Sequence, residues 1–258
     1  MRFIPLLAAS LVLGTLSARV LAPSALAADP AHDAAPASGA GHDAAAAPAA
    51  GHAPAGHGDS EAVDSALALK RLVEGNKRFV EGHPKHPHQA RDWLGSIEKG
   101  QHPFAIVVGC SDSRVPPELV FDQGFGDLFV VRVAGNVADE DGVGSVEYAV
   151  DHLGVRLVVV LGHSSCGAVS AALDHLGDKS DEPSEITSLL YRIEPALADI
   201  PKDADHDKQV AEAVRKNVQL TVRKLSRVED LRKQIKGGTV KVVGAVYDMH
   251  TGKVELLK

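Results

Sequence analysis

Three short apolar runs mark the middle of the chain. Residues 104–110 (FAIVVGC), 128–135 (LFVVRVAG) and 157–163 (LVVVLGH) are nearly continuous and rich in β-branched side chains. Such runs are typical of strands buried on both faces of a parallel sheet. A later region, 238–257, reads as two strands joined through a turn at 251–252.

Segments with helical periodicity lie between and around these runs. Residues 145–154 and 166–177 each place apolar side chains on one face and end at a glycine. A longer helix is expected over about 206–235, and an N-terminal stripe over 64–82 should be broken or loosened near Gly75. The alternation predicts an α/β fold: a central, mostly parallel β-sheet flanked by helices, with an N-terminal helical arm.

The first 60 residues differ in composition from the rest. Residues 1–27 combine Arg2 with an apolar run and a small-residue end, which is a secretory signal pattern. A membrane anchor is the alternative, but Arg19 shortens the apolar stretch below the roughly 20 residues of a span. Residues 28–60, rich in Ala, Gly, Pro and His, predict a disordered linker, with weak metal capture by the histidines as the alternative. Residues 61–258 then form one domain.

The net charge of the chain limits the classes of partner that we expect it to bind. The formal net charge is -7, and no basic cluster points to nucleic acid. No segment after the signal is long and apolar enough to span a membrane. We therefore expect an exported enzyme or binding domain, located in the periplasm.

The two cysteines of the chain stand beside other reactive residues. Cys110 ends one apolar run, His163 ends another, and Cys166 follows three residues later, where a helix should begin. Ligands gather beyond the carboxyl ends of parallel strands, so the three side chains can converge. Two thiolates and one imidazole suit a catalytic zinc site with an open position. A Cys110–Cys166 disulfide is the alternative in an oxidising compartment; spacing leaves both open, and the nearby histidine tips the balance towards metal.

Several motifs together resemble one known family. The stretches CSDSR and HSSCG, in that order, are similar to the zinc-binding motifs of the β-class carbonic anhydrases, and GDLFVVRVAGN and GSVEYAV match the same family. The resemblance covers about residues 62–258. It implies that Cys110, His163 and Cys166 bind one Zn²⁺ per chain. The implied activity is the reversible hydration of CO2 to bicarbonate and a proton, that of a carbonate dehydratase, by hydroxide that zinc supplies near neutral pH.

The resemblance also assigns roles to Asp112 and Arg114. In this family the two side chains form a dyad, in which Arg114 holds the carboxylate by charge-assisted hydrogen bonds. Asp112 then orients the water that attacks CO2, while Arg114 keeps Asp112 from becoming a fourth zinc ligand. Taken without the motif, the two residues would be read as a surface ion pair of little energetic weight.

The substrate CO2 is apolar, so its pocket should be mostly hydrophobic. The residues that the resemblance places in or beside it are Gln123, Phe129, Ala134, Tyr148 and Gly167. His152 lies one helical turn after Tyr148 and is a candidate proton shuttle, or else a surface histidine near a helix end. Family members are dimers or larger, so we expect a homodimer or homotetramer whose pockets are completed by the neighbouring subunit.

One departure from the family pattern bears on the subtype. Members inhibited by bicarbonate carry a tryptophan three residues before the first zinc cysteine, whereas this chain has Val107 there and its single tryptophan at Trp93. We therefore expect the open-site subtype.

Two other functions stay open: hydrolysis of carbonyl sulfide or carbon disulfide at the same site, and non-catalytic zinc binding that uses the histidine-rich segment. Zinc storage would need neither Asp112 nor Arg114.

Overall fold

The computed structural model describes residues 62–177, 182–201 and 203–258. Its centre is a five-stranded sheet in the order β2-β1-β3-β4-β5. Neighbouring strands run parallel except for β5, which is antiparallel to β4. The strands are β1 (Ala105–Gly109), β2 (Leu128–Arg132), β3 (Leu157–His163), β4 (Lys241–Tyr247) and β5 (Val254–Leu256). The predicted α/β fold with a mostly parallel sheet is confirmed, while the predicted signal peptide and linker lie outside the described residues.

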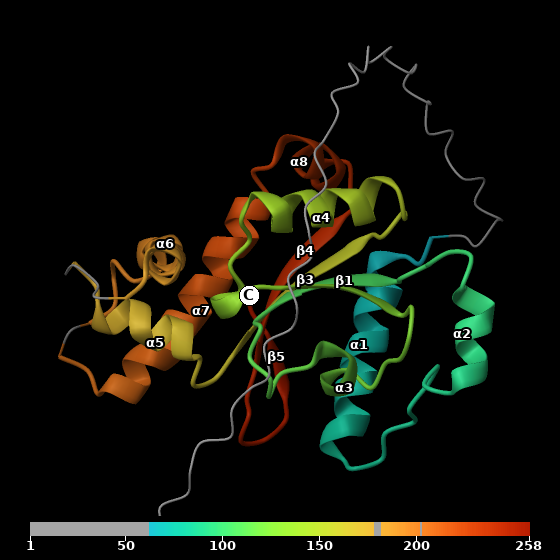
Figure 1. Ribbon diagram of the computed structural model, residues 1–258, viewed down its shortest axis with the longest axis horizontal. Helices are drawn as coiled ribbons and strands as arrows, with labels where there is room; N and C mark the ends of the chain where they lie inside the picture. Colours follow the sequence, from blue (N-terminus) through green and yellow to red (C-terminus); the bar gives the residue numbers. More distant parts are fainter. Residues whose placement is uncertain (1–61, 178–181, 202) are drawn as a thin grey trace, which may run out of the picture. The chain divides into compact units, whose positions relative to one another are not determined.

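Helices cover both faces of the sheet (Figure 1). α1 (Ser65–Val80) and α3 (Pro117–Val120) lie on one face, and α4 (Glu140–Asp151), α7 (His206–Leu225) and α8 (Glu229–Lys236) lie on the other. A third group packs against α7 and consists of α5 (Gly167–Asp174), α6 (Ser184–Ile193) and the 3-10 turn η2 (Glu194–Ala196). The remaining elements are α2 (Arg91–Ile97) and a second 3-10 turn, η1 (Ala134–Asn136).

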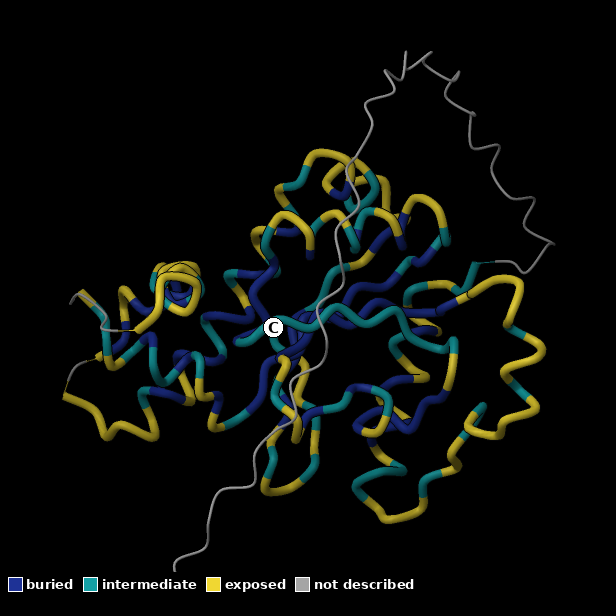
Figure 2. The backbone as a smooth tube through the Cα atoms, in the orientation of Figure 1, coloured by how far each residue is buried: buried dark blue, intermediate teal, exposed yellow. Residues whose placement is uncertain are grey.

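The alternation of side chains along each strand divides the core in two. Val107 of β1 packs in a cluster with Leu72 of α1, whereas its neighbour Ile106 packs in a cluster with Val146 of α4. Every residue of β1 and β3 is buried, as expected for central parallel strands, and Figure 2 shows these strands in the buried colour at the centre. The apolar runs are continuous because both faces of these strands are covered.

The N-terminal helix differs from the expectation. α1 runs without interruption through Gly75, so the predicted break is wrong. A Cβ atom at Gly75 would lie 1.8 Å from the Phe121 carbonyl oxygen. The glycine therefore allows α1 to approach the segment after α3 closely, and this packing outweighs the modest cost of glycine inside a helix.

The helical region near the C-terminus also differs from the expectation. The single helix predicted over 206–235 is two helices, α7 and α8, separated by residues 226–228. The side chain of Ser226 bonds back to the Val222 carbonyl at the end of α7. Beyond the break, Leu231 of α8 is buried in the same cluster as Leu225 of α7 and Val146 of α4. Tertiary packing of α8 beside α4 thus sets the break, which helical periodicity alone does not reveal.

Asp122 ties the N-terminal region to the segment after α3. Its carboxylate is fully buried and pairs with Arg78 of α1, with 2.6 Å between Arg78 Nε and Asp122 Oδ2. It also accepts hydrogen bonds from the backbone N–H groups of Lys85 and His86. Burial raises the pKa of Asp122, but these donors outweigh burial and leave the pKa below its ordinary value. The ionised carboxylate therefore stabilises the folded state.

Replacing this carboxylate should destabilise the protein. We expect Asp122→Asn to lower the free energy of unfolding by about 2–4 kcal/mol at pH 7, because the buried donors lose a charged acceptor. Because the folded pKa lies below the unfolded one, this stabilisation is complete above the ordinary pKa and is lost as the pH falls through the folded pKa. Urea unfolding from pH 7 down to pH 3 should show a constant difference between the two proteins until the pH falls below the ordinary pKa of 3.8, and a shrinking difference below it. Asp203→Asn, the same change at an exposed residue, is the control. Equal free energies of unfolding for Asp122→Asn and wild type at pH 7 would contradict the prediction.

Candidate metal centre

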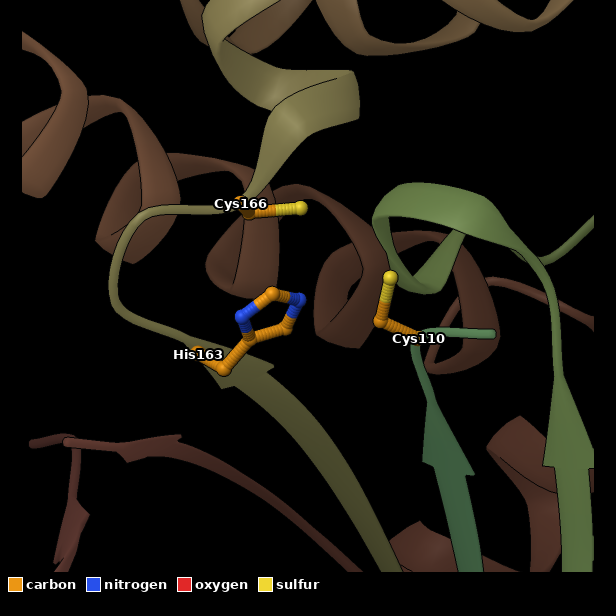
Figure 3. A group of neighbouring side chains, drawn as sticks. All are labelled: Cys110, His163 and Cys166. Atoms are coloured by element: carbon orange, nitrogen blue, oxygen red, sulfur yellow. The ribbon is translucent and has the colours of Figure 1, made fainter. Parts of the chain in front are cut away.

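Two neighbouring strands and one helix bring the three candidate ligands together. Cys110 follows the end of β1, His163 ends β3, and Cys166 precedes the first residue of α5. β1 and β3 are paired in parallel register, so their carboxyl ends meet at one edge of the sheet. Both sulfurs and a ring nitrogen point towards a common space (Figure 3), and the three ligand atoms lie within 4.8 Å of one another.

The orientation of His163 suits a metal ligand. The side chain is fully buried, and Nδ1 lies 3.0 Å from the Ser164 carbonyl oxygen, to which it can donate. With the proton on Nδ1, Nε2 keeps its lone pair. Nε2 is one of two buried side-chain polar atoms within the described ranges that make no hydrogen bond of good geometry. A buried, unpartnered nitrogen facing two thiols fits a soft divalent metal such as zinc.

Backbone N–H groups support the Cys110 sulfur. The amide of Asp112 lies 3.4 Å from Cys110 Sγ, and the amide of Gly135 lies 3.3 Å from it. Gly135 belongs to η1 and has a φ of 65°. A Cβ atom there would also lie 2.7 Å from Ile193 Cδ1, so only glycine brings this amide to the sulfur without strain.

The two thiols share a buried, interacting environment. The hydrogen bond from the Cys166 thiol to Cys110 lowers the pKa of Cys110 to about 4 and, in the same way, raises the pKa of Cys166. The pair therefore loses its first proton easily and holds the second. Both cysteines are free thiols in the structure, which does not contain the Cys110–Cys166 disulfide considered above.

Asp112 and Arg114 form a two-pronged ion pair at the edge of the cluster. Arg114 Nε lies 2.9 Å from Asp112 Oδ1, and Arg114 Nη2 lies 2.7 Å from Oδ2. The hydrogen bond from Arg114 is the main reason that the pKa of Asp112 lies well below its usual range. Asp112 Oδ2 lies 3.9 Å from His163 Nε2, so an ionised carboxylate faces the ligand cluster.

Comparison with known proteins identifies the family. The family model described as "Carbonic anhydrase" matches residues 105–254. The chain is 43% identical over 190 residues to carbonic anhydrase 2 of Mycobacterium tuberculosis, covering 73% of this chain and 91% of that one. A carbonic anhydrase of Mycolicibacterium smegmatis is 44% identical over 191 residues, with the same coverage. Solved β-carbonic anhydrases share the fold: CcaA has a TM-score of 0.60 at 27% identity, covering 74% of this chain and 95% of that one. The chain belongs to the β-carbonic anhydrase family.

Another solved β-carbonic anhydrase is similar over the same region. A structure described as one of two tetrameric enzymes from Sordaria macrospora has a TM-score of 0.59 at 26% identity. It covers 74% of this chain and 94% of the Sordaria chain. The family resemblance inferred from the motifs is thus confirmed, and with it the assignment of this chain as an enzyme, a carbonic anhydrase.

The predicted pocket residues of this carbonic anhydrase fall into two groups. Ala134 begins η1 and Gly167 begins α5, so each is next in sequence to a residue of the centre, Gly135 or Cys166. The other group, Gln123, Phe129 and Tyr148, is not next in sequence to any residue of the centre. Its contacts are a hydrogen bond from Gln123 Nε2 to the Phe121 carbonyl and ring contacts that join Phe129 to Tyr148 and Tyr148 to His152. Their roles in substrate binding and proton transfer stay predictions.

One residue of this β-carbonic anhydrase, Arg132, contacts the loop of the metal centre and was not predicted from the sequence. It ends β2, next to Gly109 of β1 in the register. Arg132 Nε donates to the Cys110 carbonyl at 2.8 Å, and Nη2 donates to the Asp112 carbonyl at 2.6 Å. Arg132 therefore clamps the loop that carries a candidate ligand and the dyad carboxylate. The available signal was an arginine inside an otherwise apolar strand.

Removing this clamp should loosen the metal centre of the carbonic anhydrase. Arg132→Met keeps much of the side-chain length but loses both donors, and we expect a loss of about 10- to 100-fold in zinc affinity or CO2 hydration, as for other residues that orient metal ligands. Arg132→Lys, with one compact donor group, should be intermediate. Zinc competition with a chromophoric chelator and hydration assays measure both. Wild-type values for Arg132→Met would show that the loop needs no clamp.

Proposed function

We propose that this β-carbonic anhydrase hydrates CO2 reversibly with one zinc ion held by Cys110, His163 and Cys166. The observation that carries the proposal is the convergence of two buried thiols and an unpartnered Nε2 within 4.8 Å. Three protein ligands leave one position open, as catalytic zinc sites require. Structural zinc sites usually have four protein ligands, and the chain has no third cysteine to complete such a set.

Different residues of the chain have different roles in the proposed reaction. Bound zinc would lower the pKa of water and supply hydroxide near neutral pH. The N–H groups of Asp112 and Gly135 stabilise negative charge on the Cys110 sulfur. Ser164, through its carbonyl, holds His163 in the tautomer that leaves Nε2 free to bind. Arg114 keeps Asp112 ionised, so this carboxylate can accept a hydrogen bond from the attacking oxygen.

One combined measurement tests the proposal. Purified protein should contain about one zinc per chain, as a single three-ligand site would hold, and CO2 hydration measured on the same sample should scale with zinc content. Zinc without hydration would favour a binding protein, or an enzyme acting on carbonyl sulfide or carbon disulfide, which a parallel hydrolysis assay would detect. Hydration by zinc-free protein would end the zinc proposal.

We further propose that the site belongs to the open subtype. Val107 is buried within β1 at the position where bicarbonate-inhibited members carry tryptophan. Arg114 contacts both oxygens of Asp112, which supports a carboxylate held as a partner of arginine and not as a metal ligand. X-ray absorption should then find two sulfur ligands and one imidazole, with no carboxylate. A bound carboxylate in active protein at neutral pH would contradict this subtype.

We infer that the enzyme is a homodimer or homotetramer. Large apolar side chains are exposed on the described part of the chain, including Leu67, Val73, Phe125 and Tyr148. Tyr148 and its ring neighbour Phe129 are predicted pocket residues, so a neighbouring subunit that covers them would complete the pocket. Analytical ultracentrifugation of active enzyme should show two or four chains, and an active monomer would refute the inference.

We also propose that the mature protein is periplasmic. The support is the signal pattern in residues 1–27 of the sequence. Among the described residues, no helix combines the length and apolar character that a membrane crossing requires. Mass spectrometry of protein recovered from a periplasmic fraction should give an N-terminus at Ala28. Intact protein retaining Met1 in the cytoplasm would contradict export.

A further inference from the structure

A cavity lies between the ends of α6 and α7, apart from the metal centre. Its volume is about 360 Å³, within the range of small-molecule sites. The neighbouring turn η2 contacts α7 here, which places the end of α6 next to α7 (Figure 1). Neither the three candidate ligands nor the Asp112–Arg114 dyad line this cavity.

The lining of this cavity is strongly cationic. It includes Arg192 of α6, Arg223 and Lys224 of α7, and Arg227 just after α7, and no carboxylate residue is part of the lining. Four positive side chains gather here in a chain whose formal net charge is -7. All four residues are exposed, so water and salt screen part of their mutual repulsion, and an anion bound among them would lower it further.

The arginines of the cavity have no acidic partners of their own. Within the described residues, Arg192, Arg223 and Arg227 form no ion pair, whereas Arg215, earlier on α7, pairs with Glu255. Lys224 instead donates to the Ala138 carbonyl. The guanidinium groups therefore keep their donors for another acceptor.

Helix ends explain part of this arrangement. Arg192 stands in the last turn of α6, and Arg223 and Lys224 in the last turn of α7, where cations interact favourably with the helix dipole. Each helix end contributes only about half a negative charge, so two ends offset about one of the four cations. The remaining positive charge, and its convergence on one cavity, are not explained by the dipoles.

Two buried polar residues of the cavity lining are held in place by hydrogen bonds. Asn217 and Thr221 of α7 are buried and line the cavity. Asn217 Nδ2 donates to the Gly135 carbonyl at 2.7 Å, and Thr221 Oγ1 donates to the Asn136 carbonyl at 3.2 Å. These hydrogen bonds hold this part of the lining against η1. The cavity is therefore bounded by packed elements and not by a loop alone.

We propose that this cavity binds a phosphate-class dianion, either inorganic phosphate or the phosphate group of a small ester. Planar guanidinium groups bind phosphate oxygens with two parallel hydrogen bonds, and three of the four cations here are arginines. The cavity is larger than one phosphate group, which leaves space for the remainder of an ester. The site does not depend on zinc, so its failure and a failure of the proposed CO2 chemistry can be told apart.

Calorimetric titration of the full-length protein tests the site directly. Inorganic phosphate and ribose 5-phosphate are titrated separately, each with and without saturating acetazolamide, the compound in complex with the solved Coccomyxa β-carbonic anhydrase, which is added to compete with anions for the metal centre. We expect one anion per chain to bind with either probe. Tighter binding of the ester would assign the extra space to its sugar, and tighter binding of inorganic phosphate would assign the site to the free anion.

A matched pair of variants makes the titration specific. Arg192→Gln/Arg223→Gln should weaken binding by about tenfold or more, because the anion loses the charge-assisted hydrogen bonds of two guanidinium groups. Arg91→Gln/Arg232→Gln makes the same chemical and charge change at exposed arginines elsewhere and should bind as wild type does. Thermal unfolding confirms that both variants fold. Equal binding by all three proteins, or no binding once acetazolamide is present, would overturn the proposal.

Discussion

Replacing Cys110 with serine is expected to remove zinc and, with it, nearly all CO2 hydration. Serine keeps the shape of cysteine, but its hydroxyl does not ionise near neutral pH and is a harder ligand than a thiolate. Only Cys166 and His163 would remain to hold the metal. Hydration should fall by about three orders of magnitude or more, because the source of hydroxide is lost.

The fold should survive this change, which makes the result informative. The two core clusters on the faces of the sheet contain no residue of the metal centre, and in the third cluster, where Cys110 is buried, serine is close in size to the cysteine it replaces. Circular dichroism should therefore match wild type while metal analysis shows zinc far below one per chain. Ser113→Ala, an exposed change in the same loop, is the matched control and should keep zinc and activity. A Cys110→Ser protein with full zinc and normal turnover would refute the proposed ligand set.

Replacing Arg114 with alanine is expected to damage catalysis while leaving zinc in place. Arg114 is the side chain that occupies both Asp112 oxygens, and Asp112 Oδ2 lies 3.9 Å from His163 Nε2. Once released, the Asp112 carboxylate would be free to serve as a fourth ligand of bound zinc. We expect hydration to fall by about 100-fold or more, the range seen when a group active in proton transfer or orientation is lost. The free energy of unfolding should hardly change, because Arg114 is 57% exposed and such ion pairs contribute little.

A second variant separates closure of the site from loss of the dyad. Asp112→Ala also removes the orienting carboxylate, but it has no side chain that can close the metal site. Azide should therefore bind the metal in Asp112→Ala and be excluded in Arg114→Ala. X-ray absorption should find an additional carboxylate ligand only in Arg114→Ala. If Arg114→Ala keeps full activity and binds azide as wild type does, the holding role of Arg114 is wrong.

Local patterns in the sequence were sufficient to predict the central strands and the α/β fold of this protein. β1 and β3 are central strands with both faces covered, so their sequences are apolar at nearly every position and stand out from the rest. The convergence of Cys110, His163 and Cys166 could also be predicted from the sequence. The reason is that the carboxyl ends of neighbouring parallel strands meet at one edge of the sheet. Family membership rested on short motifs that carry their chemistry within a few residues, such as Asp112 with Arg114.

Only the tertiary structure decided the features that join distant segments. The reach of Arg132 to the Cys110 loop, the Gly135 amide at Cys110 Sγ and the approach of Gly75 to the Phe121 carbonyl all cross between elements. The periodicity of one segment predicts which of its faces is buried. It does not predict which backbone group of a distant segment that face contacts. The break between α7 and α8 arose in the same way, because it depends on where α8 can bury Leu231 and not on a helix-breaking residue in the chain.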